Sequence, residues 1–178
     1  SEYHACQPVN LYGYSKWIFE QHLDLCARMH ALQYMIIRPS NPYGPYQNPM
    51  RMQGFIAVAM HKLLQGKEIE IWGDGSVVRD YIFVTDMAYA FATMLARDPW
   101  GEVFNIGSGT GSSLLEVVAA MEQVSGKKAR VLYKDSRSVD VNRIVLDVTK
   151  LKSVIDFQPK SLSNGLHLYH EGLMNAAA

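Results

Sequence analysis

A tyrosine and a lysine near the start of the chain have a spacing that could support proton transfer. Tyr12 and Lys16 are four residues apart, so on a helix their side chains share one face and lie within contact range. A free tyrosine has a pKa of ~10, and a fixed ammonium group about one turn away favours the phenolate and lowers that pKa. The pair could then take a proton from a hydroxyl group while a hydride leaves the same carbon atom. The competing interpretation is a surface helix with an ordinary lysine, which the spacing alone does not exclude.

The elements that must position this pair follow an alternation of helical and strand patterns. Apolar residues recur at helical spacing over residues 10–31, and a short buried-strand pattern covers residues 33–37. Residues 39–50 are rich in proline and predict a shaped loop, because proline stops a strand ladder. Further helices are expected at 55–64, 87–96, about 113–125, a short segment from 147 and about 161–175, and further strands at 69–72, 102–106 and 130–133. This alternation predicts an α/β fold.

Two of the expected helices carry capping signals at their first residues. Asp86 precedes the helix at 87–96 and is expected to cap it rather than to do chemistry. Ser112 or Ser113 precedes the helix that ends at Ser125, and Glu116 lies three residues after Ser113. This spacing predicts a capping box, in which serine and glutamate satisfy each other's backbone N–H groups.

The composition excludes several classes of function. The 178-residue chain is 48% hydrophobic and 19% charged, typical of a globular protein of one domain or a domain and a half. Its formal net charge is zero, so neither nucleic acid nor an anionic membrane is expected as a partner. The two cysteines, Cys6 and Cys26, form no disulfide or metal pattern, and no metal is expected. No apolar run reaches the ~20 residues of a membrane span and no signal peptide is visible, which predicts a soluble cytoplasmic protein.

Five motifs follow one another in an order that resembles a known family. The Tyr12–Lys16 run is followed by Arg38-Pro-Ser-Asn-Pro-Tyr-Gly-Pro45, by Gly73-Asp-Gly-Ser-Val-Val-Arg-Asp-Tyr-Ile-Phe-Val-Thr-Asp86, by Phe104-Asn-Ile-Gly-Ser-Gly109 and by Arg137-Ser-Val-Asp140. Together these motifs resemble the C-terminal half of the extended short-chain dehydrogenase/reductases, in particular the nucleotide-sugar epimerases and dehydratases. The resemblance covers nearly the whole chain.

This resemblance implies the C-terminal part of a Rossmann-type doubly wound sheet with a small, interleaved α/β domain that binds a nucleotide sugar. The Rossmann-type elements would lie at about 10–45 and 80–108, and the substrate-domain elements at about 46–79 and 109–178. The Gly-x-x-Gly-x-x-Gly turn that holds the dinucleotide in this family does not occur in the sequence. The chain is therefore expected to be the C-terminal half of an enzyme, and by itself to lack tight NAD binding and activity.

The resemblance also assigns the catalytic and cofactor-binding residues. Tyr12 would be the catalytic base, and Lys16 would tune it and hold the nicotinamide ribose of NAD. Both residues thus count as catalytic and as cofactor-binding, and Pro39 would border the nicotinamide. The helix that carries Tyr12 and Lys16 would form the interface of a homodimer.

Six further positions are implied for a UDP-sugar substrate. They are Asn41 near the phosphates, Trp72 near the base, Arg79 on the diphosphate, Arg137 on the second phosphate, Asp140 on the ribose and Ile144 near the 2-substituent of the sugar. A guanidinium group can hold two phosphate oxygens at once, which suits Arg79 to a diphosphate. A bulky, β-branched residue at 144 favours UDP-hexoses without an acetylated 2-substituent.

Most of these positions also have a purely structural interpretation. Asn41 could form a turn, Trp72 could pack in the core, and Arg79 could pair with Asp80 at the surface. Arg137 and Asp140 could lie in a solvated loop.

The activity implied for the whole protein is NAD-dependent epimerisation at C4 of a UDP-sugar of the glucose/galactose type. One alternative is a nucleotide-sugar 4,6-dehydratase, which needs an additional acidic pair upstream of Tyr12. The other is a non-catalytic, nucleotide-sugar-binding fragment that lacks the NAD-binding half.

Overall fold

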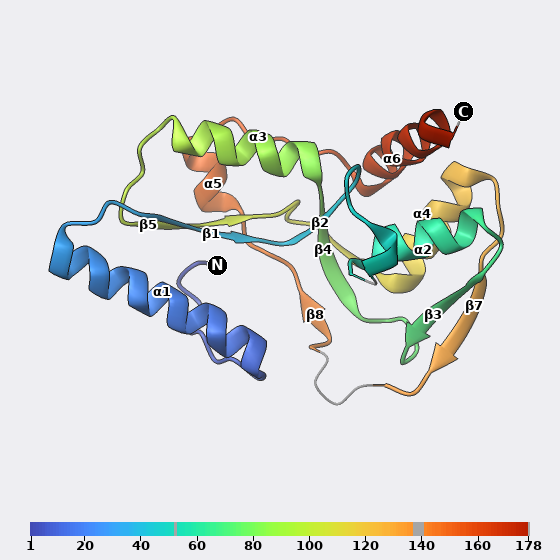
Figure 1. The fold of residues 1–178 in the computed structure, drawn as a ribbon, viewed down its shortest axis with the longest axis horizontal. Coiled ribbons are helices and arrows are strands. Elements are labelled where there is room, and N and C mark those ends of the chain that lie inside the picture. Colours follow the sequence, from blue (N-terminus) through green and yellow to red (C-terminus); the bar gives the residue numbers. More distant parts are fainter. Residues whose placement is uncertain (52, 137–140, 178) are drawn as a thin grey trace.

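The chain folds into layers of helices around short, mostly parallel strands (Figure 1). The structure, a computed structural model, describes residues 1–51, 53–136 and 141–177. The helices are α1 (Leu11–His30), α2 (Phe55–Leu64), α3 (Val84–Leu95), α4 (Leu114–Ser125), α5 (Thr149–Val154) and α6 (Leu162–Ala177), with a 3-10 turn η1 (Pro49–Arg51). The strands are β1 (Met35–Pro39), β2 (Asn41–Tyr43), β3 (Glu68–Trp72), β4 (Val78–Phe83), β5 (Glu102–Ile106), β6 (Gly111–Ser113), β7 (Arg130–Lys134) and β8 (Arg143–Ile144). The α/β class predicted from the sequence is confirmed.

Three small sheets make up the strand layer. β1 and β5 pair in parallel, with Ile37 opposite Phe104, and β3 and β7 form a second parallel pair at the other end of the molecule (Figure 1). Between them, β4 pairs in parallel with β2 and β8 and antiparallel with β6. Of the strands in the described part of the chain, β4 therefore has the most neighbours, and it links the two ends.

β4 also separates two hydrophobic cores. Successive strand side chains point to opposite faces, so Tyr81 and Phe83 enter one core while Ile82 enters the other. The first core packs α2, α4 and α6 against β3 and β4. The second packs α3 and α5 against β5, with Phe104 and Leu151 fully buried. Burial of this apolar area is the main force that fixes β4 in place.

Several predicted elements are confirmed, and three details are wrong. The expected helices at 10–31, 55–64 and 113–125 correspond to α1, α2 and α4, and the capping box of Ser113 with Glu116 is present. The predicted loop at 39–50 instead contains β2 and η1, because residues 41–43 find a strand partner in β4. β1 runs through Pro39, which pairs with Ile106, so the proline does not stop the ladder before it.

Asp86 is not the cap of α3. The helix begins at Val84, so Asp86 lies inside its first turn and is buried. Its carboxylate accepts hydrogen bonds from the backbone N–H of Lys160 at 2.7 Å and from the ammonium group of the same residue at 2.5 Å. Asp86 thus binds a residue 74 positions away, and it does not cap α3 as the sequence suggested.

Candidate functional site

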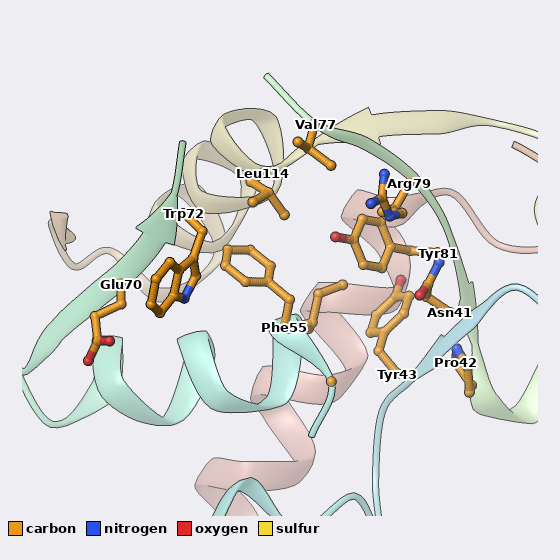
Figure 2. A pocket seen from close by; sticks show the side chains of 12 residues that line it. Asn41, Pro42, Tyr43, Phe55, Glu70, Trp72, Val77, Arg79, Tyr81 and Leu114 are labelled. Atoms are coloured by element: carbon orange, nitrogen blue, oxygen red, sulfur yellow. The ribbon is translucent and has the colours of Figure 1, made fainter. Parts of the chain in front are cut away.

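A cavity of about 240 Å³ opens between β4, β2 and the first turn of α2 (Figure 2). Its wall combines aromatic rings with a few polar groups, as small-molecule sites do. The lining residues include Asn41, Tyr43, Phe55, Glu70, Trp72, Arg79, Tyr81 and Leu114. Three of the positions predicted for a nucleotide sugar, Asn41, Trp72 and Arg79, are therefore gathered at one cavity, although 38 positions separate the first from the last in the sequence.

Arg79 reaches the cavity from β4. Strand alternation places Arg79 and Tyr81 on the cavity side and sends Asp80 to the opposite side. The guanidinium group donates to its neighbouring backbone oxygen, that of Val78, at 2.9 Å. Asp80 instead accepts hydrogen bonds from Ser108, Gly109 and Leu146, so the alternative of an Arg79–Asp80 ion pair finds no support. Of the described residues that line the cavity, Arg79 is the one that carries a positive charge.

Asn41 and Trp72 lie at different parts of the wall (Figure 2). The side-chain amide of Asn41 donates to the backbone oxygen of Asp80 at 2.8 Å, so it bridges β2 and β4 rather than forming a turn. Trp72 ends β3, where 40% of its surface stays exposed, beside Phe55 and Glu70. Core packing therefore does not account for Trp72, whose indole ring is accessible to a planar ligand.

Two buried tyrosines belong to the same cavity and were missed by sequence reasoning. Burial raises the pKa of Tyr81 to about 12, and burial together with the nearby Asp86 raises that of Tyr43 further. Both phenols therefore remain protonated hydrogen-bond donors near neutral pH, and Tyr43 donates to the backbone oxygen of Leu162 at 3.3 Å. Tyr81 lies two residues after Arg79 on β4 and so shares its face, but the sequence predicted no strand over these residues.

Tyr12 and Lys16 form a separate group on α1 and do not line this cavity. The helix starts at the predicted place, since the side chain of Asn10 accepts a hydrogen bond from the N–H of Gly13 at 2.8 Å. The ammonium nitrogen of Lys16 lies 5.2 Å from the centroid of the Tyr12 ring, within the range of a cation–π contact. Both side chains are exposed, so the shared helix face predicted from the spacing is present and open to a ligand.

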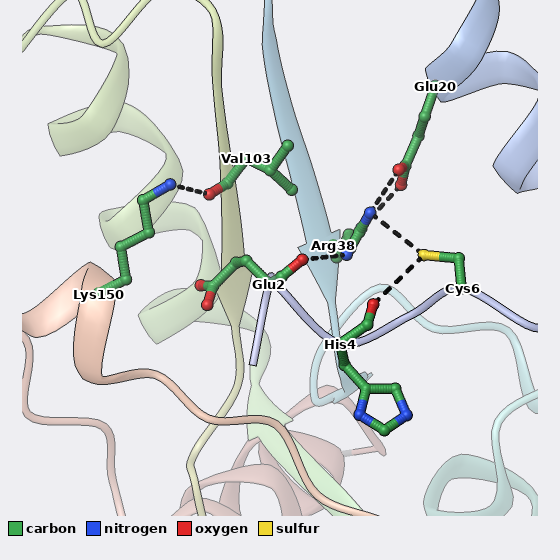
Figure 3. Close-up of polar contacts among 7 residues, drawn as sticks. All are labelled: Glu2, His4, Cys6, Glu20, Arg38, Val103 and Lys150. Atoms are coloured by element: carbon green, nitrogen blue, oxygen red, sulfur yellow. Dashed lines mark hydrogen bonds and ion pairs between the residues drawn. The ribbon is translucent and has the colours of Figure 1, made fainter.

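An ion pair that the sequence did not reveal joins α1 to β1 (Figure 3). The guanidinium group of Arg38 donates to the carboxylate of Glu20 at 2.8 Å and 2.5 Å, and to the backbone oxygen of Glu2 at 3.3 Å. Hydrogen bonding to Glu20 raises the pKa of Arg38. The helix that carries Tyr12 and Lys16 is thereby held beside the strand that ends at Pro39.

The remaining predicted positions are more loosely connected with the cavity. Ile144 lies on β8, opposite Arg79 in the strand ladder, but is not among the cavity-lining residues. Pro39 is exposed at the end of β1. Arg137 and Asp140 lie outside the described residues, so their positions stay predictions.

Among the residues whose placement is described, His, Cys, Asp and Glu nowhere form a group of three or more that could hold a metal ion. Over the same part of the chain, no helix is both long enough and apolar enough to cross a membrane.

The described surface fits a dinucleotide beside α1. Tyr12, Lys16 and Pro39 are all exposed, and Lys16 offers a cation that can donate to ribose hydroxyls. The hydroxyl oxygen of Ser40, directly after Pro39, is buried and has no hydrogen-bond partner among the residues that the structure describes. Such an atom at the C-terminal end of a parallel strand is typical of a place where α/β folds receive a ligand.

Comparison with known proteins identifies relatives along nearly the whole chain. A putative UDP-glucose 4-epimerase of Methanocaldococcus jannaschii is 33% identical over 86% of this chain and 50% of its own length. The crystal structure of a UDP-glucose 4-epimerase from Thermotoga maritima with UDP-glucose superposes with a TM-score of 0.89 at 36% identity, covering 97% of this chain and 56% of that one. A UDP-glucose 4-epimerase from Thermus thermophilus in complex with NAD gives 0.87 at 31% identity, with 96% and 56% coverage. The chain thus spans about half the length of the curated relatives it matches.

Other relatives at about 30% identity are dTDP-sugar reductases and dehydratases. The names of these relatives all refer to nucleotide sugars, but they do not refer to one reaction.

One prediction about the family is contradicted. The order of the five motifs and the missing glycine-rich turn placed the resemblance in the C-terminal half only. The model of the NAD dependent epimerase/dehydratase family instead matches residues 1–107, as its NAD-binding part. The matched residues include α1 and the parallel β1–β5 pair. With more than half of its length matched, the chain belongs to the NAD dependent epimerase/dehydratase family.

Proposed function

We propose that this chain serves the NAD-dependent epimerisation, at C4, of a UDP-sugar of the glucose/galactose type. The observation that carries the proposal is the cavity that gathers Arg79, Asn41 and Trp72, three positions that the sequence motifs assign to a nucleotide sugar. The relatives described as UDP-glucose 4-epimerases support the same reaction.

Each part of the cavity suits one part of a nucleoside diphosphate sugar. The guanidinium group of Arg79 suits the diphosphate, and Asn41, fixed by its bond to Asp80, lies beside it for a second polar contact. Trp72 and Phe55 offer aromatic faces for a planar base at the far side of the cavity (Figure 2). Arg137 and Asp140 are proposed to complete the contacts with the second phosphate and the ribose.

Tyr12 and Lys16 are proposed as the proton-transfer pair. The phenolic oxygen of Tyr12 would take the proton from the C4 hydroxyl of the sugar. It would return the proton after the sugar ring has rotated to present its opposite face to the cofactor. The ammonium group of Lys16 would stabilise the phenolate and hold the nicotinamide ribose, with Pro39 bordering the nicotinamide. Bound NAD would supply the reversible hydride acceptor at C4.

The two hydrophobic cores support a division of the chain into two parts. We propose that residues about 10–45 and 80–108 belong to the Rossmann-type part, and residues about 46–79 and 109–178 to an interleaved nucleotide-sugar part.

α1 exposes Leu11, Ile18, Phe19, Leu25 and Met29, which supports a homodimer through this helix. The free cysteines, Cys6 and Cys26, suit a reducing, cytoplasmic compartment.

The direct test is to incubate the full-length protein with NAD and UDP-glucose and to separate the nucleotide sugars. UDP-galactose at a constant total of UDP-sugar is the expected product. A second candidate is a 4,6-dehydratase, since dTDP-glucose 4,6-dehydratases are among the relatives. Loss of the mass of one water from dTDP-glucose, without formation of UDP-galactose, would favour that candidate and refute the epimerase.

A further inference from the structure

A buried carboxylate lies on the strand that carries Arg79. Asp80 is fully buried and sits between Arg79 and Tyr81, but its side chain points away from the cavity that they line. A buried carboxylate is unfavourable unless hydrogen bonds compensate for the lost hydration. The partners of Asp80 therefore show what this residue holds together.

Four donors from two distant segments converge on this carboxylate. Oδ1 accepts from the N–H and the hydroxyl of Ser108, at 2.8 Å and 2.7 Å. Oδ2 accepts from the N–H of Gly109 at 3.1 Å and the N–H of Leu146 at 3.3 Å. Within the described ranges no Lys or Arg forms an ion pair with Asp80, so neutral donors alone stabilise its charge.

The backbone makes room for this arrangement. A Cβ atom at Gly107 would lie 2.4 Å from Oδ2 of Asp80, closer than real Cβ contacts allow. The turn after β5 therefore needs glycine at 107 because the carboxylate occupies that space, which gives this glycine a packing role.

The same residue reaches the cavity wall through its backbone. The backbone oxygen of Asp80 accepts the hydrogen bond from the side-chain amide of Asn41 at 2.8 Å. Leu146 follows β8, whose Ile144 pairs with Arg79. One residue thus fixes β4 against the turn at 107–109 and the segment after β8, while it orients the amide of Asn41.

We propose that Asp80 is a positioning residue of the nucleotide-sugar site, which sets the geometry of Arg79 and Asn41 without touching the ligand. This inference rests on the proposed binding of a UDP-sugar at the cavity. It assigns the carboxylate a role in affinity, beyond a general role in stability.

The test replaces Asp80 by asparagine in the full-length protein and measures UDP-glucose binding by calorimetry. In this variant an amide NH2 group replaces one carboxylate oxygen, so a donor would face N–H groups that need an acceptor. We therefore expect the affinity for UDP-glucose to fall roughly tenfold or more. KM should rise more than kcat falls, because Tyr12 is untouched. The matched control is Asp86→Asn, the same change at another buried, hydrogen-bonded aspartate outside the cavity wall; it should change affinity by less than about twofold at a temperature where both variants are folded.

A milder pair of variants covers the case in which Asp80→Asn does not fold. Ser108→Ala removes one of the four donors and should weaken UDP-glucose binding roughly twofold to fivefold. Ser125→Ala removes a hydroxyl that bonds within its own helix and should leave binding unchanged. Wild-type affinity in folded Asp80→Asn or in Ser108→Ala, or an equal loss in Asp86→Asn, would overturn the assignment. Wild-type protein that binds no UDP-sugar would instead overturn the proposed function, and the role of Asp80 in binding with it.

Discussion

The helix that carries the proposed proton-transfer pair and the wall of the cavity are held in place in opposite ways. All twenty residues of α1 are described, and none of them is buried. α4, behind the cavity, buries Val117, Val118 and Met121, packs on α6 and starts with a capping box. The packed core therefore fixes the geometry of the cavity wall. The position of α1 depends instead on its N-cap and on the Arg38–Glu20 ion pair.

This difference predicts which substitutions should change activity and which should also change stability. An exposed side chain on α1, such as Tyr12, lies outside the core, so its loss should alter the proposed chemistry and leave folding intact. A side chain of the cavity wall is coupled to β4, on which both hydrophobic cores rest. The following variants separate these two behaviours.

The largest effect is expected at Tyr12. Tyr12→Phe removes the proposed proton acceptor and should lower kcat of the proposed epimerisation roughly 10²–10⁴-fold while UDP-glucose binding and thermal stability stay close to wild type. Tyr14→Phe is the matched control, since Tyr14 lies on the same helix and packs near Trp17. Near wild-type turnover by Tyr12→Phe would remove this residue from the mechanism.

Arg79→Ala should act on binding instead. A hydrogen bond to a charged group contributes about 1.5–3 kcal/mol, so the dissociation constant for UDP-glucose should rise roughly tenfold to a hundredfold. Arg130→Ala is the control, because Arg130 forms an exposed ion pair with Glu68 on the β3–β7 sheet. Calorimetry with free glucose, which has no phosphate, should show no difference between the variants; an equal loss for that sugar would contradict the assignment.

Glu20→Gln tests how α1 is attached. The Arg38–Glu20 pair is mostly shielded, with side-chain exposures of 26% and 19%, so loss of the charge should destabilise the protein by about 1.5–3 kcal/mol. Asp24→Asn breaks an exposed pair with Arg28 on the same helix and should change stability by less than about 0.5 kcal/mol. Thermal melting of both variants measures the difference, and equal melting temperatures would show that packing rather than the ion pair holds α1.

Ile144→Gly should produce a smaller change, in substrate preference. Ile144 is exposed beside Arg79, so its removal should favour UDP-N-acetylglucosamine over UDP-glucose by roughly 1 kcal/mol, or about fivefold in kcat/KM. Because Ile144 does not line the cavity itself, this variant also tests whether the sugar end of the site extends to β8. Comparable kinetics of the wild-type protein on both substrates would refute the predicted preference.

Local patterns in the sequence predicted α1, α2, α4 and the capping box, because caps and helical periodicity act within a few residues. They missed both β2 and β4, which pair with each other across 40 residues of sequence, and they misread Asp86, whose partner is Lys160. At the site, the sequence named Arg79, Asn41 and Trp72 through family motifs. It did not reveal that Asp80 binds Ser108 and Leu146 or that Arg38 binds Glu20, since such pairs depend on the fold rather than on spacing.

The smallest effect is expected at the cap of α4, and it depends on pH. Hydrogen bonds from the backbone N–H and hydroxyl of Ser113 lower the pKa of Glu116 below its usual 4.5. A carboxyl group whose pKa is lowered by folding stabilises the protein above its unfolded pKa, and that contribution disappears as the pH falls through the folded pKa. The melting temperature of Glu116→Gln should therefore be lower than that of the wild type at pH 7. The difference between the two melting temperatures should disappear as the pH falls below about 4.5. Since α4 is anchored by buried residues as well, the change should be slight and should leave UDP-glucose affinity unaltered, whereas a gap that persists unchanged at pH 3 would show that the ionised glutamate is not what stabilises this helix end.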